Sequence, residues 1–582
     1  MSAPPNYHAT TDYDAIVIGG GHNGLVTANY LARAGKRVLV LEARPVVGGA
    51  CVTEELIPGS KWSSCAFIAG LLRPEIIEEL ELKRFGLELY QGDALSFSLF
   101  RDGTSFTMWK ETDRTLREIE KLNKRDAQSF LDFGMRLQRF AGLVTPYLLT
   151  APPERSEVLA AFEAAGEQTL FGEFTLLSVR DLLDRYFEDE RLKSMLTFFG
   201  MVSIFGGPSS PGTAYTYGHH SWGEFNGNFG QFGLARGGMG AISDALAAGA
   251  RHYGATIRTS APVDKVVIER GVATGVRLED GAVITAHQVF SNADPKRSLL
   301  RLIEPGVLPP RLVQDVENID TRGSMARIHL LIDELPQYLP FRDATAGPQH
   351  HGHQLLGPSR EAFEEAFEAQ RRGGFPSTFV IEAVTQSVTD NTLAPEGLHT
   401  MTLGIQQLPS ELTGTTWAAE KEKWADLVLE ELFGYAPNLR EHILDRVIIT
   451  PDDLANEYLI TDGNIFHGSM MLDQLFGARP IPELANYRTP VGNYYLCGSG
   501  THPGGGVMGA NGHNAAKAAL ADAAGGPPTG RTAGTAAADA RPPWQQRLVG
   551  ALMSTRSGRW VGYQAARQPA LRKITTYAAR VR

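Results

Sequence analysis

The sequence predicts an α/β fold, in which helices pack against a mainly parallel sheet, and three observations support this class. The apolar stretch 13–18 runs into a glycine-rich turn and then into a helical stretch. After residue 240, a helical stretch leads into short apolar stretches, with Asp280-Gly281 as a hairpin turn between two of them. The stretch 493–497 is again followed by a glycine-rich turn and a helical stretch. Short buried strands that alternate with helices are typical of parallel sheets.

The first strand–turn–helix unit has the spacing G-x-G-x-x-G. Gly19, Gly21 and Gly24 allow, in turn, a tight turn, close approach of the backbone to a pyrophosphate, and close packing of the helix on the strand. The helix N-terminus offers free N–H groups and a partial positive charge to the phosphates. A second strand, 38–41, ends at Glu42, whose carboxylate can accept hydrogen bonds from ribose hydroxyls. Together these parts predict a Rossmann-type dinucleotide site.

Three further features favour FAD over NAD as the dinucleotide. The doublet Gly48-Gly49 allows a second close approach of the backbone to the same cofactor. The glycine-rich turn 498–509 leads into a helix whose N-terminus would stabilise the negative charge that reduction places on the N1–C2 edge of a flavin. The sequence contains no second unit of strand, G-x-G-x-x-G turn, helix and acid, which paired FAD and NAD(P)H domains would need. We therefore expect one noncovalent FAD.

These motifs resemble those of the phytoene desaturase family of flavoproteins. The turn 498–509 is similar to the C-terminal signature of that family, and two more segments share the likeness, 235–240 and 289–295. Segments 60–74 and 466–476 resemble the branch that contains pyridine nucleotide-disulfide oxidoreductase domain-containing protein 2 and the desaturase-like carotenoid ketolases. The resemblance covers residues 12–525. It implies FAD, a two-domain fold and redox chemistry on an apolar substrate.

The residues expected to contact FAD come from several parts of the chain. They are Gly19, Gly21, Gly24, Glu42, Gly48, Gly49, Gly498, Gly505, Gly506, Val507 and Met508. The resemblance also implies that Val263 lies beside the adenine.

The chain is predicted to form two discontinuous domains. A Rossmann-type FAD-binding domain is expected from three segments, 12–75, 235–300 and 455–525. A mixed α+β substrate domain over the flavin is expected from two inserts, 76–234 and 301–454. The first insert reads as mostly helical, with helices such as 116–140 and 177–205.

Two segments follow these domains. Residues 526–543, rich in Ala, Gly, Pro and Thr, predict a linker. Residues 544–582 contain eight basic residues, no acidic residue and interspersed apolar side chains. This pattern fits either an amphipathic helix on an anionic membrane surface or a helix docked on the acidic remainder of the chain.

Composition excludes several classes of function. The net charge of −10 argues against nucleic acid as the main partner. The cysteines Cys51, Cys65 and Cys497 lack the number or spacing of a disulfide framework or a zinc site. Flavin-disulfide reductases have a second cysteine where this chain has Leu56, so that chemistry is not expected. No apolar stretch has the length of a membrane span, and no secretion signal is apparent. We expect a cytoplasmic protein, with a peripheral position on a membrane as the alternative.

Catalytic residues are harder to find than cofactor residues. His502 and His513 are the candidates because the C-terminal motif places them near the flavin, with Asn511 and His467 as further candidates. A purely structural role for these histidines stays open. The other histidine clusters lack an accompanying ligand set, so we interpret them as solvated loop residues and expect no metal. They are His219-His220 and His350-His351-Gly352-His353.

The sequence thus predicts an FAD-dependent oxidoreductase, a phytoene dehydrogenase-like enzyme, that acts on a large apolar substrate of isoprenoid, carotenoid or lipid type. Dehydrogenation by hydride transfer to flavin N5 is favoured. The alternatives are a carotenoid ketolase or saturase of the same fold, and a flavin-bearing regulatory or interaction protein with little turnover. An amine oxidase would need an aromatic cage at the flavin, which Tyr494-Tyr495 do not provide. Oxygen or a membrane quinone is the expected electron acceptor.

Overall fold

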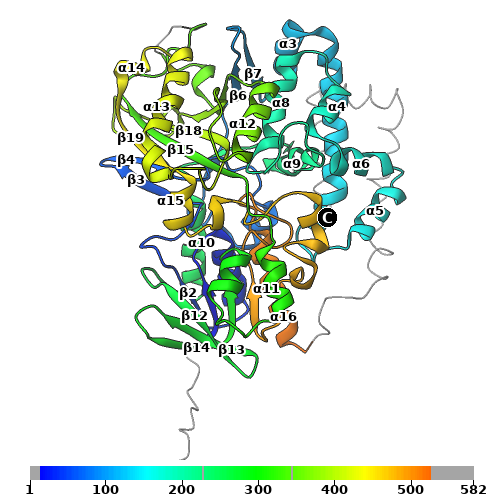
Figure 1. Ribbon diagram of the computed structural model, residues 1–582, viewed down its shortest axis with the longest axis vertical. Coiled ribbons are helices and arrows are strands. Elements are labelled where there is room, and N and C mark those ends of the chain that lie inside the picture. The colour runs from blue at the N-terminus through cyan, green and yellow to red at the C-terminus, as the bar shows by residue number, and fades with distance from the viewer. Residues whose placement is uncertain (1–12, 226–227, 342–344, 526–582) are drawn as a thin grey trace, which may run out of the picture. The chain divides into compact units, whose positions relative to one another are not determined.

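A parallel sheet forms around β1 (Tyr13–Ile18), which pairs with β2 (Val38–Leu41) on one side and β14 (Val283–Ser291) on the other. Strand β11 (Thr256–Arg258) extends the sheet beyond β2, and β20 (Tyr494–Leu496) pairs with the end of β14. Figure 1 shows β2 and β14 close together in the lower part of the picture. Three distant parts of the chain therefore build one sheet. The predicted α/β class with a Rossmann-type sheet is confirmed, whereas the exact segment boundaries of the two domains stay a prediction.

The parallel sheet is covered on both faces. Val17 and Val40 face a cluster with three helices: α1 (His22–Arg33), α10 (Gly240–His252) and α16 (Ala510–Ala523). Ile16 and Leu39 face the opposite way, because side chains alternate along a strand. They pack against the antiparallel β12 (Val263–Glu269) and β13 (Val272–Leu278), and against α11 (Pro310–Glu317). The predicted Asp280-Gly281 turn does connect β13 to β14.

A second sheet of seven strands has the order β19-β15-β18-β17-β16-β6-β7. These strands are β19 (Ile443–Ile449), β15 (Ser324–Ile332), β18 (His399–Leu408), β17 (Ile381–Val384), β16 (His353–Leu356), β6 (Ala94–Leu99) and β7 (Ser105–Trp109). One face is apolar and is covered by α13 (Trp417–Tyr435), where Ile328 and Leu403 pack with Trp424. Strands β6 and β7 lie in the stretch 76–234 that the sequence predicted as mostly helical.

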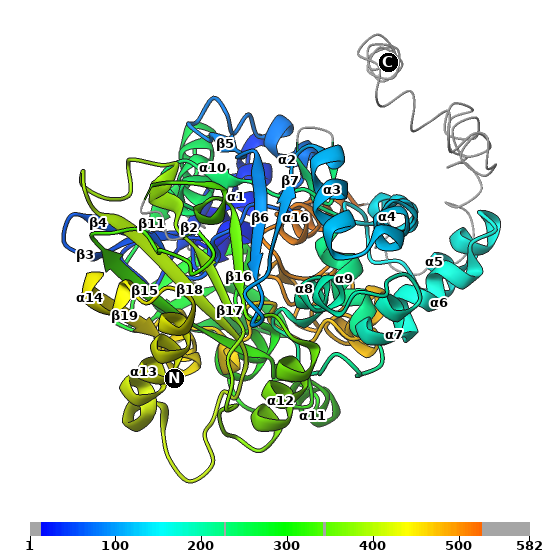
Figure 2. The ribbon, with the colours of Figure 1, turned by 90° about the horizontal axis from the view of Figure 1, so that it is seen from above.

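Helices α3 to α9 gather on one side of β6 and β16 to β18 (Figure 2). They are α3 (Thr112–Leu122), α4 (Lys124–Val144), α5 (Arg155–Ala164), α6 (Gln168–Leu176), α7 (Val179–Asp184), α8 (Glu190–Met201) and α9 (Thr213–His220). The predicted helices 116–140 and 177–205 were wrong in their continuity. Asn123 caps α4 by accepting hydrogen bonds from backbone N–H groups, and Asp189 caps α8 in the same way, so each stretch contains a new helix start.

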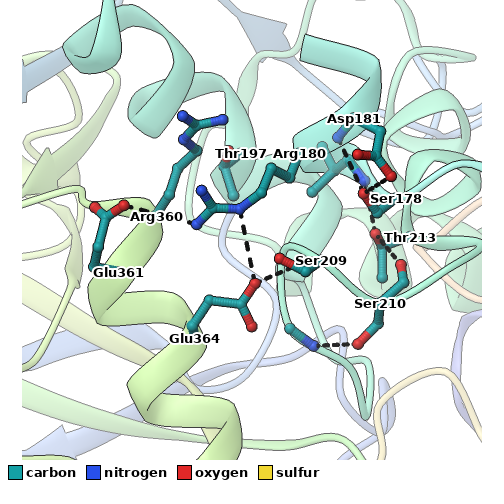
Figure 3. A network of polar contacts seen from close by, with 12 residues as sticks. Ser178, Arg180, Asp181, Thr197, Ser209, Ser210, Thr213, Arg360, Glu361 and Glu364 are labelled. Carbon is teal, nitrogen blue, oxygen red and sulfur yellow. Dashed lines mark hydrogen bonds and ion pairs between the residues drawn. The ribbon is translucent and has the colours of Figure 1, made fainter. Parts of the chain in front are cut away.

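Polar contacts join this helical layer to α12 (Arg360–Arg371). Arg180 lies between Glu361 and Glu364, with nitrogen–oxygen distances of 3.7 and 3.9 Å (Figure 3). The Ser209 N–H donates to Glu364 Oε1 at 2.7 Å. The helical layer is therefore joined to α12 by charged and polar contacts.

The computed structural model describes residues 13–225, 228–341 and 345–525, and the predicted linker and basic tail lie outside this part. Within it, no helix has both the length and the apolar character needed to cross a bilayer. Apart from short 3-10 and π turns, the remaining elements are β3 (Thr53–Ile57), β4 (Ser60–Ser63), α2 (Pro74–Glu79), β5 (Leu89–Tyr90), β8 (Glu224–Phe225), β9 (Asn228–Phe229), β10 (Leu234–Ala235), α14 (Leu439–His442) and α15 (Pro451–Asn456).

Candidate flavin and substrate site

The turn between β1 and α1 admits only glycine at its key positions. Gly19 has φ of +93°, in the left-handed region that favours glycine. A Cβ atom on Gly21 would lie 2.7 Å from Asn292 Nδ2, and one on Gly24 would overlap the Gly19 carbonyl oxygen. The turn therefore requires glycine at these positions, while contact of its backbone with a pyrophosphate stays a prediction.

Glu42 lies at the end of β2, beside this turn, and is buried. Its Oε2 accepts a hydrogen bond from the Gly20 N–H at 2.7 Å, and its Oε1 accepts one from the Arg44 N–H at 2.9 Å. Burial raises the pKa of this carboxyl, and the backbone N–H groups oppose that rise. A carboxylate oxygen has a second lone pair, so both oxygens can still accept a ribose hydroxyl.

Three more of the predicted cofactor residues lie beside the first turn. The Gly48 N–H donates to the Gly20 carbonyl at 2.9 Å, and a Cβ atom on Gly49 would lie 3.4 Å from the Gly21 Cα. The Ala261 N–H donates to the Glu42 carbonyl at 2.9 Å, which places the start of β12, and so Val263, on the Glu42 side of the site.

The C-terminal motif meets α1 from the opposite side. The Asn23 amide donates to Ser499 Oγ at 3.3 Å, and a Cβ atom on Gly512 would overlap the Asn23 carbonyl oxygen. The starts of α1 and α16 are therefore in contact, and their N-terminal N–H groups lie in one region. A dinucleotide with two phosphates and a flavin fits such a paired arrangement.

Some of the buried side-chain atoms that have no hydrogen-bond partner among the described residues belong to these turns or to elements beside them, and others lie elsewhere in the described chain. The atoms at the turns or beside them are His22 Nε2, Asn23 Oδ1, Arg44 Nη1, His219 Nδ1, His467 Nδ1, His502 Nδ1 and Asn511 Oδ1. Leaving such an atom unpaired costs about 1–3 kcal/mol, so a native fold rarely keeps several together without a ligand. The residues of the site therefore fit FAD, a ligand rich in donors and acceptors.

The structure corrects the prediction that His219 is a solvated loop residue. His219 lies on α9 and is fully buried. Its Nε2 lies 2.9 Å from the Gly505 carbonyl oxygen, to which it donates, so in the neutral ring Nδ1 is an unprotonated acceptor. Burial holds the pKa of His219 well below its ordinary value. His350, in the 3-10 turn that precedes β16, and His353, the first residue of β16, are buried as well. Strand β16 pairs with a strand on each side, a placement that histidine spacing does not reveal.

The two histidines predicted as catalytic have different surroundings. His502 Nε2 donates to the Tyr147 carbonyl at 2.9 Å, its Nδ1 has no partner, and burial lowers its pKa to about 4. His513 Nδ1 pairs with Asn514 Oδ1 at 2.8 Å, and its ring meets Tyr30 edge-on at 4.9 Å. His502 thus resembles His219 in presenting a bare acceptor, whereas His513 is engaged on the α1 side.

Sequence reasoning missed an ionic network on the inner face of the second sheet. Arg327 Nη1 lies 2.9 Å from Glu382 Oε2, and His353 Nε2 donates to Glu382 Oε1 at 3.2 Å. Burial raises the pKa of Glu382, but the charge of Arg327 and the hydrogen bond from His353 outweigh burial and lower it to about 2. A signal was present in β15, where Arg327 and His329 alternate with apolar residues and so define a polar face.

This network extends towards the Gly505 turn through aromatic side chains. The His353 ring lies 5.0 Å from that of Phe198, and the rings of His219 and His220 are 5.5 Å apart. The charge of Glu382 acts on His220, while His219 bonds to Gly505. The histidines of α9 therefore lie between the ionic network and the turn expected to hold the flavin.

The three cysteines are free and buried. Burial raises the pKa of Cys51, Cys65 and Cys497 to about 12 each, so their thiols stay protonated and unreactive at neutral pH.

Comparison with known proteins identifies the family. The model of the flavin-containing amine oxidoreductase family matches residues 24–520. The chain belongs to this family. It is therefore an oxidoreductase, and its cofactor is FAD.

Individual relatives agree with membership of the flavin-containing amine oxidoreductase family. Pyridine nucleotide-disulfide oxidoreductase domain-containing protein 2 of Mus musculus is 38% identical over 550 residues, covering 88% of this chain and 94% of the mouse protein. The neurosporene-forming phytoene desaturase of Cereibacter sphaeroides is 28% identical over 539 residues, covering 89% and 96%. A solved oxidoreductase from Methanosarcina mazei shares the fold, with a TM-score of 0.56 at 17% identity, covering 87% and 99%. The predicted relationship to phytoene desaturase-type flavoproteins is confirmed.

Proposed function

We propose that the chain dehydrogenates a large apolar substrate of isoprenoid, carotenoid or lipid type. FAD bound at the paired turns supplies the hydride acceptor. The observation that carries the proposal is the aromatic wall around the histidines beside Gly505. The His219 ring lies 4.6 Å from that of Trp222 and 5.9 Å from that of Phe466. Apolar walls with few polar groups are typical of sites for apolar ligands, and a phytoene desaturase is among the relatives.

Dehydrogenation also releases a proton, for which the chain must supply an acceptor. We assign this role first to His219, because the Gly505 carbonyl fixes its tautomer and leaves Nδ1 bare. His502 offers a second bare Nδ1, and His353 a third candidate nitrogen, since Glu382 holds its Nε2–H. A weak base suffices here, because a carbon that has lost hydride releases its neighbouring proton readily.

The electron acceptor follows from the number of nucleotide sites. The sequence contains one dinucleotide unit, which FAD fills, so we propose oxygen or a membrane quinone as the oxidant. Ketolation and saturation remain the alternative reactions of the same fold.

The experiment starts from purified protein whose FAD is identified after acid extraction. Oxidised protein is then mixed anaerobically with phytoene in detergent micelles, and the flavin absorbance is followed. Bleaching supports the proposal. Bleaching by NADPH or NADH instead favours a saturase or ketolase. FAD that none of these reductants bleaches favours a regulatory protein with little turnover.

Variants then test the assigned proton acceptor. His219→Gln should slow phytoene-driven bleaching at least about a hundredfold, the lower end of the range that general-base groups contribute. His442→Gln is the matched control, because His442 pairs at the surface with Asp333, 2.8 Å away. Equal rates in both variants would move the role to His502 or His353.

A further inference from the structure

Arg479 is a buried cation that has no anionic partner among the described residues. Its side chain is 1% exposed and donates five hydrogen bonds, all to backbone carbonyls. The acceptors are Thr501 at 3.1 Å, Ser469 at 2.6 Å, Gln474 at 3.2 Å, Phe466 at 2.7 Å and Ser499 at 2.9 Å. Among the described residues Arg479 forms no ion pair.

The other buried arginines are paired. Arg73 lies 3.1 Å from Glu75, Arg327 lies 2.9 Å from Glu382, and Arg360 lies 2.7 Å from Asp184. Transferring an unpaired charge from water to a protein interior is costly, so native folds usually supply a counter-charge. Arg479 is an exception to this rule and lies beside the expected flavin site, which indicates a role for its charge at that site.

The positive charge persists and acts on its surroundings. Burial lowers the pKa of Arg479 only to about 10, so the guanidinium is protonated at neutral pH. Its charge adds to burial in lowering the pKa values of His219, His467 and His502, and so helps to keep these rings neutral. The local field therefore disfavours further positive charge and favours negative charge.

Arg479 lies close to the start of α16. The Thr501 carbonyl accepts from Arg479 Nε at 3.1 Å and from Asn511 Nδ2 at 2.9 Å, and Asn511 is in the first turn of α16. A Cβ atom on Gly504 would lie 3.8 Å from Arg479 Nε. One carbonyl thus separates the guanidinium from the helix terminus that is expected to face the N1–C2 edge of the flavin.

We propose that Arg479 is a positioning residue that sets the redox potential of the bound flavin. Together with the N-terminus of α16, its uncompensated charge stabilises the negative charge that the flavin acquires on reduction. This inference rests on the proposed placement of the flavin at residues 498–509. The charge of Arg479 would make the bound flavin a better electron acceptor. This role would explain why the arginine is buried without a carboxylate partner among the described residues.

The experiment uses FAD-loaded protein and sulfite, an anionic probe whose sulfur adds to flavin N5 and leaves negative charge on the ring. Arg479→Gln should weaken sulfite binding at least tenfold. It should also lower the midpoint potential by at least the equivalent of a tenfold change, about 30 mV for a two-electron couple. Arg360→Gln, which removes a buried but paired arginine far along the chain, should change neither value.

Arg479→Lys separates charge from scaffolding, because it keeps the cation and loses most of the hydrogen bonds. Its potential should stay near that of the wild type at low pH. Burial lowers a lysine pKa, so its sulfite affinity should fall with rising pH more steeply than that of the wild type. A structural role alone would not produce this pH profile.

Several outcomes would overturn the inference. Unchanged potential and sulfite affinity in FAD-loaded Arg479→Gln would reduce Arg479 to scaffolding while leaving the proposed function intact. If Arg479→Gln does not hold FAD, two other results would also reduce Arg479 to scaffolding. One is a wild-type flavin that does not bind sulfite at millimolar concentration. The other is an Arg479→Lys variant with the pH profile of the wild type. A chain that purifies without FAD would instead contradict the cofactor assignment itself.

Discussion

The two sheets differ in what they bury. The parallel sheet is apolar on both faces, with Val17 pointing to the helices and Ile16 to the antiparallel strands. The second sheet is apolar only beneath α13. Its other face is equally buried but includes Arg327, His329 and Glu382.

This difference separates two ways of recognising a ligand. The parallel sheet presents backbone turns at its strand ends, so its interior needs no polar side chains. The second sheet presents side chains, which can be exchanged without altering the backbone. Burying polar groups on the face of a sheet costs free energy unless they are paired. Their presence in the second sheet therefore indicates a role in binding or chemistry. The proposed cofactor site at the parallel sheet depends instead on glycine.

Gly21→Val should produce the largest effect, the complete loss of FAD. Its side chain would start 2.7 Å from Asn292 Nδ2 and fill the place of the pyrophosphate. The measurement is the ratio of flavin to protein after purification. Gly142→Ala, in α4 with no neighbour within 4 Å of the added Cβ atom, is the control. Retention of FAD by Gly21→Val would break the assignment of the first sheet to the cofactor.

Glu382→Gln should destabilise the fold by about 3–5 kcal/mol, because it leaves Arg327 as an unpaired buried charge. The folded-state pKa of Glu382, about 2, lies below its ordinary 4.5. The carboxylate therefore stabilises the fold fully above about pH 5, and this contribution is lost as the pH falls towards 2. The difference in the free energy of unfolding between wild type and variant, measured with urea, should narrow over that pH range. A difference that does not depend on pH would contradict an ionised Glu382 paired with Arg327.

Glu42→Ala should weaken FAD binding at least about tenfold, since hydrogen bonds to a charged group contribute about 1.5–3 kcal/mol each. Titration of the apoprotein with FAD measures the change. Glu279→Ala removes an exposed carboxylate and serves as the control. An unaltered dissociation constant would remove Glu42 from the ribose site.

Ser178→Ala should have the smallest effect, a loss of about 1 kcal/mol, because the Ser178 hydroxyl caps α7 by accepting the Asp181 N–H at 3.0 Å. Thermal unfolding measures it, and the FAD content should not change. A loss of FAD would show that the helical layer and the cofactor turns are coupled more tightly than the contrast between the two sheets implies.

The part of the structure that sequence predicts well is local. The unit from Tyr13 to Glu42 could be read because its glycines, strands and acid follow one another at fixed spacing. The strands joined by Asp280-Gly281 were predicted from their apolar stretches and from that hairpin turn, which are local signals as well.

The features that escaped prediction depend on distant partners. Glu382 is ionised because Arg327, 55 residues away, lies beside it. Arg479 is satisfied by carbonyls on two loops, and nothing near it in the sequence indicates burial. His353 was expected to be solvated because polar residues are usually exposed, and only the pairing of β16 with β6 and β17 places it inside.

Strand β14 belongs to two arrangements, since its first half pairs antiparallel with β13 and its last residues pair parallel with β20. The Asn23 amide likewise donates a hydrogen bond to Ser499, which lies 476 residues further along the chain. During synthesis on the ribosome, the proposed FAD site therefore stays incomplete until almost the whole described chain has emerged. FAD should therefore bind only after most of the described chain has been synthesised. A chain truncated before β20 should be produced without FAD and then degraded.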